Sequence, residues 1–218
     1  MRSANTIFNS STKASRLVLV ALAAAALGGT LAGTGCAGKH AKDATIVPDR
    51  DRAAELAQAQ RFQEQAFNAQ KDEEYDRAIS LYSQALQIDS SLGAAWHNVG
   101  ICFMKQKRYL DAQRAFIKAA DAMPSDPRPY ESLGVLFIDQ GFAKQSYEWY
   151  GRALERDPYS LAALRGSTRA IKLLRLVSTD AQSRLQRGLE VESNKEWRTI
   201  MTTERIRVEA GLREEARR

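Results

Sequence analysis

Residues 93–126 read GAAWHNVGICFMKQKRYLDAQRAFIKAADAMPSD, and residues 127–160 repeat their pattern of side chains at an interval of 34 residues. A weaker copy precedes them at residues 59–92. The positions that stay in phase are Trp96 and Tyr130; Gly100 and Gly134; Tyr82, Phe116 and Tyr150; Ala85, Ala119 and Ala153; and Ala78, Ala112 and Ser146. Because several positions share one interval, the chain contains an internal structural repeat.

Each copy of the repeat predicts two α-helices joined by a short turn. In the middle copy, Trp96, Gly100 and Phe103 follow the spacing of one buried helical face. Glycine inside a helix costs ~1 kcal/mol relative to alanine. We therefore expect Gly100 and Gly134 to be required where the partner helix approaches closely.

The pattern resembles the tetratricopeptide repeat (TPR), whose aromatic, glycine, alanine and proline positions it carries in order. The resemblance implies an all-α fold, a right-handed α-solenoid of three TPR helix pairs stacked on one another. The predicted repeats cover about 59–92, 93–126 and 127–160, within a TPR domain of residues 49–177.

The segments on both sides of the repeats are also predicted to be helical. A helix that begins at Asp49 is expected to extend the first repeat helix backwards and to cover the exposed end of the stack. Residues 161–177 continue the phase and predict a capping helix. Residues 178–218 depart from the repeat and predict a C-terminal helical extension, in which Ser178 is expected to cap a helix through about Val191 and Asn194 another through about Arg217. The sequence leaves open whether this extension folds back on the array or pairs with another chain.

Residues 1–35 have the order of a secretory signal peptide: a basic segment, an apolar run and small residues. The apolar run, LVLVALAAAAL at residues 17–27, is shorter than the ~20 residues of a membrane-spanning helix. Cys36 directly follows the small-residue segment GGTLAGTG at residues 28–35, which resembles the lipobox of bacterial lipoproteins and implies lipid attachment at Cys36. Residues 36–48 are polar and predict a flexible tether.

These features predict an exported protein, held as a lipoprotein at the periplasmic face of the outer membrane. A soluble periplasmic protein and an inner-membrane anchor are the alternatives. Residues 1–35 hold three of the 32 basic residues and none of the 26 acidic residues. Without them the net charge of the chain is 29 − 26 = +3. The basic residues therefore predict no nucleic-acid partner.

The sequence carries no motif for catalysis or for binding a cofactor. Its histidines are His40 and His97, its cysteines are Cys36 and Cys102, and it contains no HExxH, paired CxxC or P-loop motif. We therefore expect a non-enzymatic protein with no catalytic residues, no metal site and no cofactor.

The resemblance to TPR proteins implies a concave partner-binding groove along the first helices of the repeats. The expected apolar floor consists of Phe67, Ile101, Met104, Val135 and Ile138. The expected polar near edge consists of His97, Asn98 and Arg128, and the expected basic end at the capping helix consists of Arg165 and Arg169. Such a groove suits a peptide or helix with apolar anchors and a few acidic groups. The clamp with which chaperone-binding members hold a C-terminal carboxylate is matched only at Asn98 and Arg128.

The sequence thus predicts a protein–protein interaction scaffold or adaptor in the bacterial cell envelope, with a protein or peptide partner and a lipid anchor in the membrane. Analogy within the family suggests a role in pilus or secretion-system assembly. The alternative is a structural envelope lipoprotein that forms homo-oligomers and whose groove is occupied by its own residues 178–218.

Overall fold

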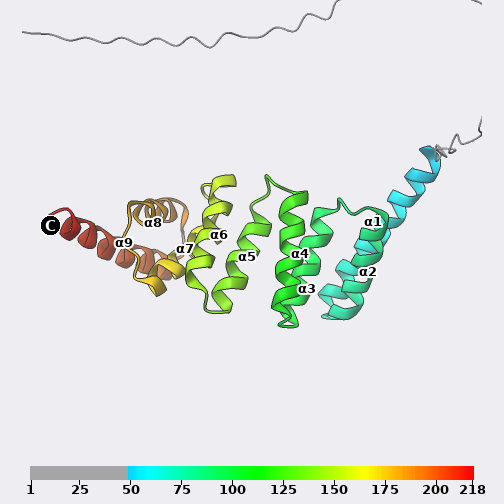
Figure 1. The fold of residues 1–218 in the computed structure, drawn as a ribbon, viewed down its shortest axis with the longest axis horizontal. Coiled ribbons are helices and arrows are strands. Elements are labelled where there is room, and N and C mark those ends of the chain that lie inside the picture. The colour runs from blue at the N-terminus through cyan, green and yellow to red at the C-terminus, as the bar shows by residue number, and fades with distance from the viewer. Residues whose placement is uncertain (1–48) are drawn as a thin grey trace, which may run out of the picture. The chain divides into compact units, whose positions relative to one another are not determined.

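The computed structural model describes residues 49–218, so the predicted signal peptide, the lipid attachment at Cys36 and the tether lie outside the described residues. The described part of the chain consists of α-helices joined by short loops, as predicted (Figure 1). The helices are α1 Asp49–Lys71, α2 Tyr75–Ile88, α3 Gly93–Lys105, α4 Tyr109–Ala122, α5 Arg128–Asp139, α6 Ala143–Arg156, α7 Leu161–Leu174, α8 Thr179–Val191 and α9 Lys195–Glu215.

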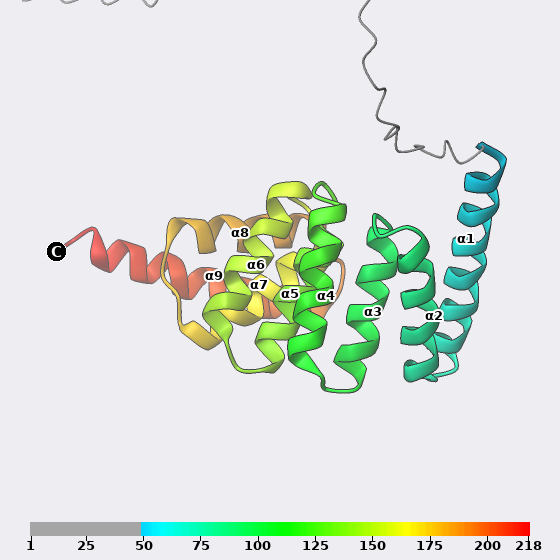
Figure 2. The same ribbon diagram turned by 45° about the vertical axis from the view of Figure 1, so that its right-hand side comes forward.

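Consecutive helices pack as pairs, and each pair packs on the next one (Figure 2). We call the pairs α1–α2, α3–α4, α5–α6 and α7–α8 units 1 to 4. The turns inside the units share one backbone geometry, with a residue of positive φ at the same repeat position: Glu73 (61°), Lys107 (61°), Gly141 (84°) and Arg175 (50°). The three predicted helix pairs are confirmed, and the helix at residues 161–174 joins α8 in a fourth pair of the same kind.

The second helix of unit 4 lacks the usual landmarks of the repeat, which is why the sequence pattern placed this helix outside the repeats. Arg184 stands where the other units have Tyr82, Phe116 and Tyr150. Its guanidinium is 3.9 Å from the ring centre of Tyr147 and donates a hydrogen bond of 3.0 Å to the Tyr147 carbonyl. The buried arginine therefore fills the aromatic position of the repeat and satisfies its polar groups locally.

The C-terminal extension folds back on the array. α9 packs against α8 and α7, as α3 packs against α2 and α1. Ser178 caps α8 by accepting a hydrogen bond from the Ala181 amide, and Asn194 caps α9 by accepting from the amides of Glu196 and Trp197. α9 thus holds the position of the first helix of a further unit.

The repeat glycines lie against the aromatic residues of the second helices. A Cβ atom built on Gly100 would lie 2.5 Å from Phe116 Cδ1, and one built on Gly134 would lie 2.6 Å from Tyr150 Cε1. Both distances are shorter than a carbon–carbon contact, so a side chain at either position would force its neighbours to move. The expected reason for the two glycines is confirmed.

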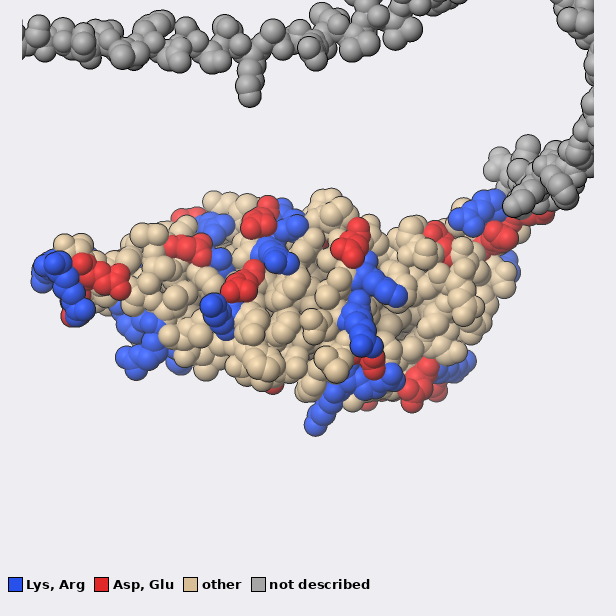
Figure 3. Space-filling view, in the orientation of Figure 1, with Lys and Arg blue, Asp and Glu red and all other residues tan. Residues whose placement is uncertain are grey.

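α1 is longer than the other first helices, as predicted, with 23 residues. Residues 51–58 are exposed along their whole length, so the expectation that this extension covers the end of the stack is wrong. On the face shown in Figure 3, basic and acidic side chains are interspersed along the array. None of the helices within residues 49–218 is both long and apolar enough to cross a membrane.

Candidate protein-binding groove

An apolar hollow of about 450 Å³ lies between α3, α4 and α5. It is lined by Ile101, Met104, Lys105, Lys107, Tyr109, Phe116, Ser132, Val135 and Asp139. Its volume falls in the range of about 300–1,000 Å³ that is common for binding pockets in proteins. This hollow is the central part of the groove predicted along the first helices.

The repeat itself brings these side chains together. Ile101 and Val135 occupy the same position of successive first helices, one residue after the glycine, and therefore point to the same side of the array. Phe116 comes from α4, is fully buried and lies over Gly100, so it lines the hollow from the second-helix side. Val135 is 38% exposed, which leaves an apolar side chain available to a partner.

The other predicted floor residues differ in their exposure. Met104 lines the hollow. Phe67 on α1 is 51% exposed and lies outside that lining, with the Lys71 ammonium 5.9 Å from its ring centre. Ile138 is only 6% exposed and is absent from the lining, so its assignment to the open floor is corrected. It lies on α5, which packs against both α6 and α7, and these contacts leave little of its side chain accessible.

The polar near edge connects the helices to one another. His97 Nε2 lies 2.9 Å from Ser132 Oγ, and its ring centre is 5.6 Å from that of Phe116. Burial lowers the pKa of His97, and the nearby Arg128 lowers it further, so the neutral imidazole is favoured. Asn98 donates a hydrogen bond of 3.0 Å to the Tyr82 hydroxyl. His97 and Asn98 are thus engaged within the chain.

The arginines predicted at the near edge and at the basic end of the groove have carboxylate neighbours within the chain, which partly offset their charges. Each of the three arginines has an acidic neighbour: Arg128 pairs with Asp126, Arg165 with Glu192 and Arg169 with Asp139. Asp126 is two residues from Arg128 and Glu192 comes from the segment between α8 and α9. The pairing therefore depends on turns and on tertiary structure, which the spacing of the repeat does not reveal.

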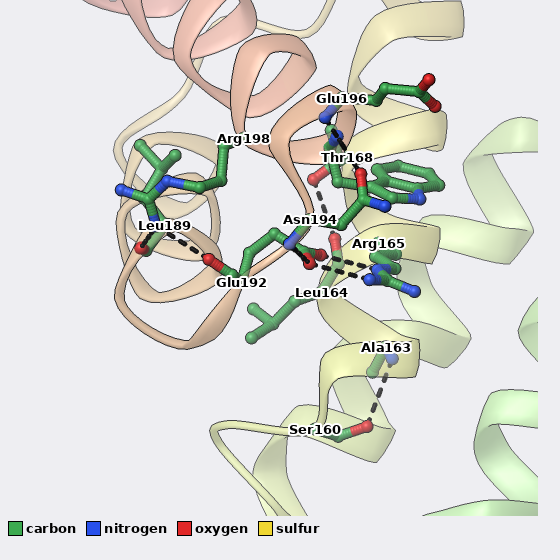
Figure 4. A network of polar contacts seen from close by, with 11 residues as sticks. Ser160, Ala163, Leu164, Arg165, Thr168, Leu189, Glu192, Asn194, Glu196 and Arg198 are labelled. Carbon is green, nitrogen blue, oxygen red and sulfur yellow. Dashed lines mark hydrogen bonds and ion pairs between the residues drawn. The ribbon is translucent and has the colours of Figure 1, made fainter.

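Figure 4 shows the segment between α8 and α9 lying against α7, with Glu192 and Asn194 beside Arg165. Glu192 is buried and accepts hydrogen bonds of 2.6 and 2.7 Å from Arg165 and of 2.8 Å from the Asn194 amide. The ring of Trp197 has its centre 5.4 Å from the Arg165 guanidinium. Arg198 donates to the carbonyls of Leu189 and Glu192. The C-terminal extension thus occupies one end of the predicted groove.

The hollow itself stays open within the described part of the chain, because no lining residue comes from 178–218. Lys105 and Lys107 lie at its rim, are exposed, and form no ion pair with another residue of 49–218. Sequence reasoning missed both lysines. Lys105 ends α3 and Lys107 lies in the turn after it, where the repeat pattern assigns no landmark.

The described residues hold no group of three or more His, Cys, Asp or Glu side chains arranged to bind a metal ion. Cys102 is a free, buried thiol, and burial raises its pKa to about 11. The thiol therefore stays protonated at neutral pH.

Comparison with known proteins agrees with the fold. Residues 69–135 match the family model of the tetratricopeptide repeat. Over 123 residues the chain is 27% identical to Hsp70-Hsp90 organizing protein 2 of Arabidopsis thaliana, an alignment that covers 56% of this chain and 21% of that protein. The chain therefore spans about a fifth of the length of this curated relative.

Two solved structures have similar folds. The first TPR domain of Spaghetti (RPAP3), bound to the HSP90 peptide SRMEEVD, has a TM-score of 0.53 at 19% identity and covers 56% of this chain and 96% of that one. YrrB, described as a TPR protein with an unusual peptide-binding site, has a TM-score of 0.52 at 20% identity and covers 67% and 84%. At these identities the similarity concerns the fold.

Proposed function

The chain is a tetratricopeptide-repeat protein, and we propose that it is a non-enzymatic protein–protein interaction adaptor that binds a peptide or helix in the hollow between α3, α4 and α5. The observation that carries this proposal is the open apolar surface of this hollow. Ile101, Met104 and Val135 offer apolar contacts, whereas His97 and Asn98 are engaged within the chain.

The charges at the hollow define the partner more closely. Among the residues that line the hollow, Lys105 and Lys107 are the cations that form no ion pair within residues 49–218. We therefore expect the partner to carry an acidic group next to its apolar anchor, placed so that it reaches these two lysines. Arg128 and Asn98 match a carboxylate clamp in type but already bond to Asp126 and Tyr82. We therefore propose an internal segment of a protein as ligand, held by side chains of the hollow.

We further propose that the adaptor works in the bacterial cell envelope, attached by lipid on Cys36 and connected by the tether of residues 36–48 to the TPR domain. The support for this step is the order of basic, apolar and small residues before Cys36. A role in pilus or secretion-system assembly is the family analogy that fits such an adaptor. The Cys36→Ser variant should leave the membrane fraction and lose incorporation of labelled fatty acid. A variant that still fractionates with membranes would contradict the lipid anchor.

Photo-crosslinking in the native cell tests the hollow. A photoreactive residue at Val135 is expected to give a discrete protein adduct, identified by mass spectrometry. The matched control is Ile117 on α4, which is 37% exposed, against 38% for Val135, and lies outside the lining of the hollow. Once the partner is known, Val135→Asp should weaken its binding at least tenfold, because one buried apolar contact of this size contributes about 1.5–3 kcal/mol. Equal losses for Val135→Asp and Ile117→Asp would refute the assignment of the hollow.

A further inference from the structure

The turns between the two helices of each unit lie along one edge of the array, seen for units 1 to 3 at the lower side of Figures 1 and 2. Unit 4 has the same turn geometry, because Arg175 adopts the positive φ of its equivalents Lys107 and Gly141. We use the name turn edge for residues 105–111, 139–144 and 172–175, the turns of units 2 to 4. The groove proposal uses only the part of this edge at Lys105 and Lys107.

The turn edge exposes large apolar side chains. Leu110 at the start of α4 is 71% exposed, Phe142 before α6 is 48% exposed, and Leu173 and Leu174 at the end of α7 are 60% and 39% exposed. None of these four lines the hollow between α3, α4 and α5. They belong to three successive units, so the apolar side chains recur along the edge.

Cations without carboxylate partners lie between these apolar side chains. Five exposed basic residues of the turn edge form no ion pair with any residue of 49–218: Lys105, Lys107, Lys144, Lys172 and Arg175. The two carboxylates of the edge are already paired, Asp111 with Arg108 and Asp139 with Arg169. In Figure 3, blue side chains project from the lower edge, with tan surface and some red side chains between them.

This composition is a property of units 2 to 4 and is not required by the fold. The equivalent turn of unit 1 carries Glu73, Glu74 and Asp76 around the same backbone geometry. An acidic turn therefore serves the fold as well as a basic one. The basic and apolar residues of the turn edge need a reason outside the packing of the repeat.

We propose that the turn edge docks onto an anionic lipid surface. Exposed Leu and Phe side chains enter the boundary between headgroups and acyl chains, while lysines and arginine remain at the level of the anionic headgroups. A protein partner fits this composition less well, because lysine is depleted in protein interfaces and charged residues are depleted at their centres. The side chains also belong to separate turns, which suits insertion into a fluid surface.

The proposal does not depend on the groove. The turn edge and the hollow share Lys105, Lys107, Tyr109 and Asp139, whereas Phe142 and Leu173 lie outside the hollow. Docking through the edge would leave Ile101 and Val135 available to a partner. The two proposals can therefore be tested separately. A crosslinking probe at Phe142 tests the turn edge, and a probe at Val135 tests the hollow.

The first test is photo-crosslinking of the full chain in its native cell, with p-benzoylphenylalanine in place of Phe142. The matched control is Tyr159, an aromatic residue that is 53% exposed and lies at the opposite end of α6. Both probes belong to the same chain with the same N-terminal segment, so any anchor affects them equally. We expect a lipid adduct, detected by mass spectrometry of the labelled peptide, at Phe142 and not at Tyr159.

Three results would overturn the proposal: a protein adduct at Phe142, which would make the edge a protein-docking surface; equal lipid labelling at both sites; and no adduct at Phe142.

The electrostatic part is tested by Lys144→Glu and Lys172→Glu in the chain that carries the Phe142 probe. Each changes the charge by two, and docking is expected to weaken about 30-fold per substitution. The control is Lys195→Glu at the start of α9, an exposed position outside the turn edge. Lipid labelling that is unchanged by Lys144→Glu and Lys172→Glu would also contradict the proposal.

Discussion

Gly134→Ala tests the packing that sets the distance between α5 and α6. A Cβ atom at this position would lie 2.6 Å from Tyr150 Cε1 and 2.7 Å from its Cδ1. The ring cannot retreat freely, because Gly166 of α7 also lies directly against it. A methyl group at position 134 therefore requires movement of α5, α6 or α7.

Two effects of opposite sign determine the size of the change. Overpacking a core costs about 1–3 kcal/mol, and the ring held between α5 and α7 places this site in the upper part of that range. Replacing a helical glycine by alanine returns ~1 kcal/mol of helix propensity. The net expectation is a loss of about 1–2 kcal/mol in the free energy of unfolding. For a chain of this size that loss lowers Tm by about 2–8 °C.

Urea unfolding followed by far-ultraviolet circular dichroism measures the effect in two backgrounds. In the Tyr150→Ala background, which itself costs about 3–5 kcal/mol, the ring is absent and Gly134→Ala should stabilise the protein by up to about 1 kcal/mol. The sign of the effect should therefore reverse. A loss of equal size in both backgrounds would refute contact with the ring as the reason for the glycine.

Two further predictions concern pH and thiol reactivity. Hydrogen bonds from Arg165 hold the pKa of Glu192 below its ordinary value, so this carboxylate stabilises the folded state above about pH 4.3 and the contribution is lost as the pH falls through the lowered pKa. The urea midpoint should therefore fall on acidification, and Glu192→Gln should remove that part of the pH dependence; an unchanged profile would contradict the role of the pair. Because burial raises the pKa of Cys102 to about 11, iodoacetamide at neutral pH should alkylate it only in denaturant, and mass spectrometry of the native protein would reveal any earlier reaction.

The features that could be predicted from the sequence are those that recur in the copies of the repeat or depend on neighbouring residues alone. The positions of Gly100 and Gly134 predicted a close approach of helices, and both glycines lie against an aromatic ring. Ser178 and Asn194 predicted the starts of α8 and α9, because a helix cap depends on neighbouring residues alone. Local chemistry and periodicity were sufficient in these cases.

The features that could not be predicted depend on single contacts between distant residues. The repeat position of Arg165 points to the groove, but Glu192 neutralises it across 27 positions of sequence. Ile138 has the pattern of a floor residue, and the contacts of α5 with its neighbours bury it. The periodicity of a repeat gives the direction of a side chain and does not give the residue that it meets.

The outer face of α1 is relevant to the alternative of self-association. On α3, the residues that contact the preceding unit are apolar: Ala95, Val99 and Cys102 lie in one cluster with α2. The equivalent residues of α1 are Arg61, Gln65 and Asn68, all exposed. A second copy that stacked on this face would bury a charge and two amides without a matching surface.

The outer face of α9 is mostly polar, with Ile206, which is 58% exposed, as the apolar exception. Where α3 presents Trp96, Gly100 and Phe103 to its partner helix, α9 has Arg198, Thr202 and Arg205. Arg198 already donates to two backbone carbonyls, and Arg205 pairs with Glu209 at 2.6 Å. Terminal units with polar outer faces keep a repeat array soluble and close it to further stacking. Because these end positions of the described array are polar while the hollow between α3, α4 and α5 is apolar and open, these features support the proposal of an adaptor that binds through its groove over the alternative of self-association through the ends.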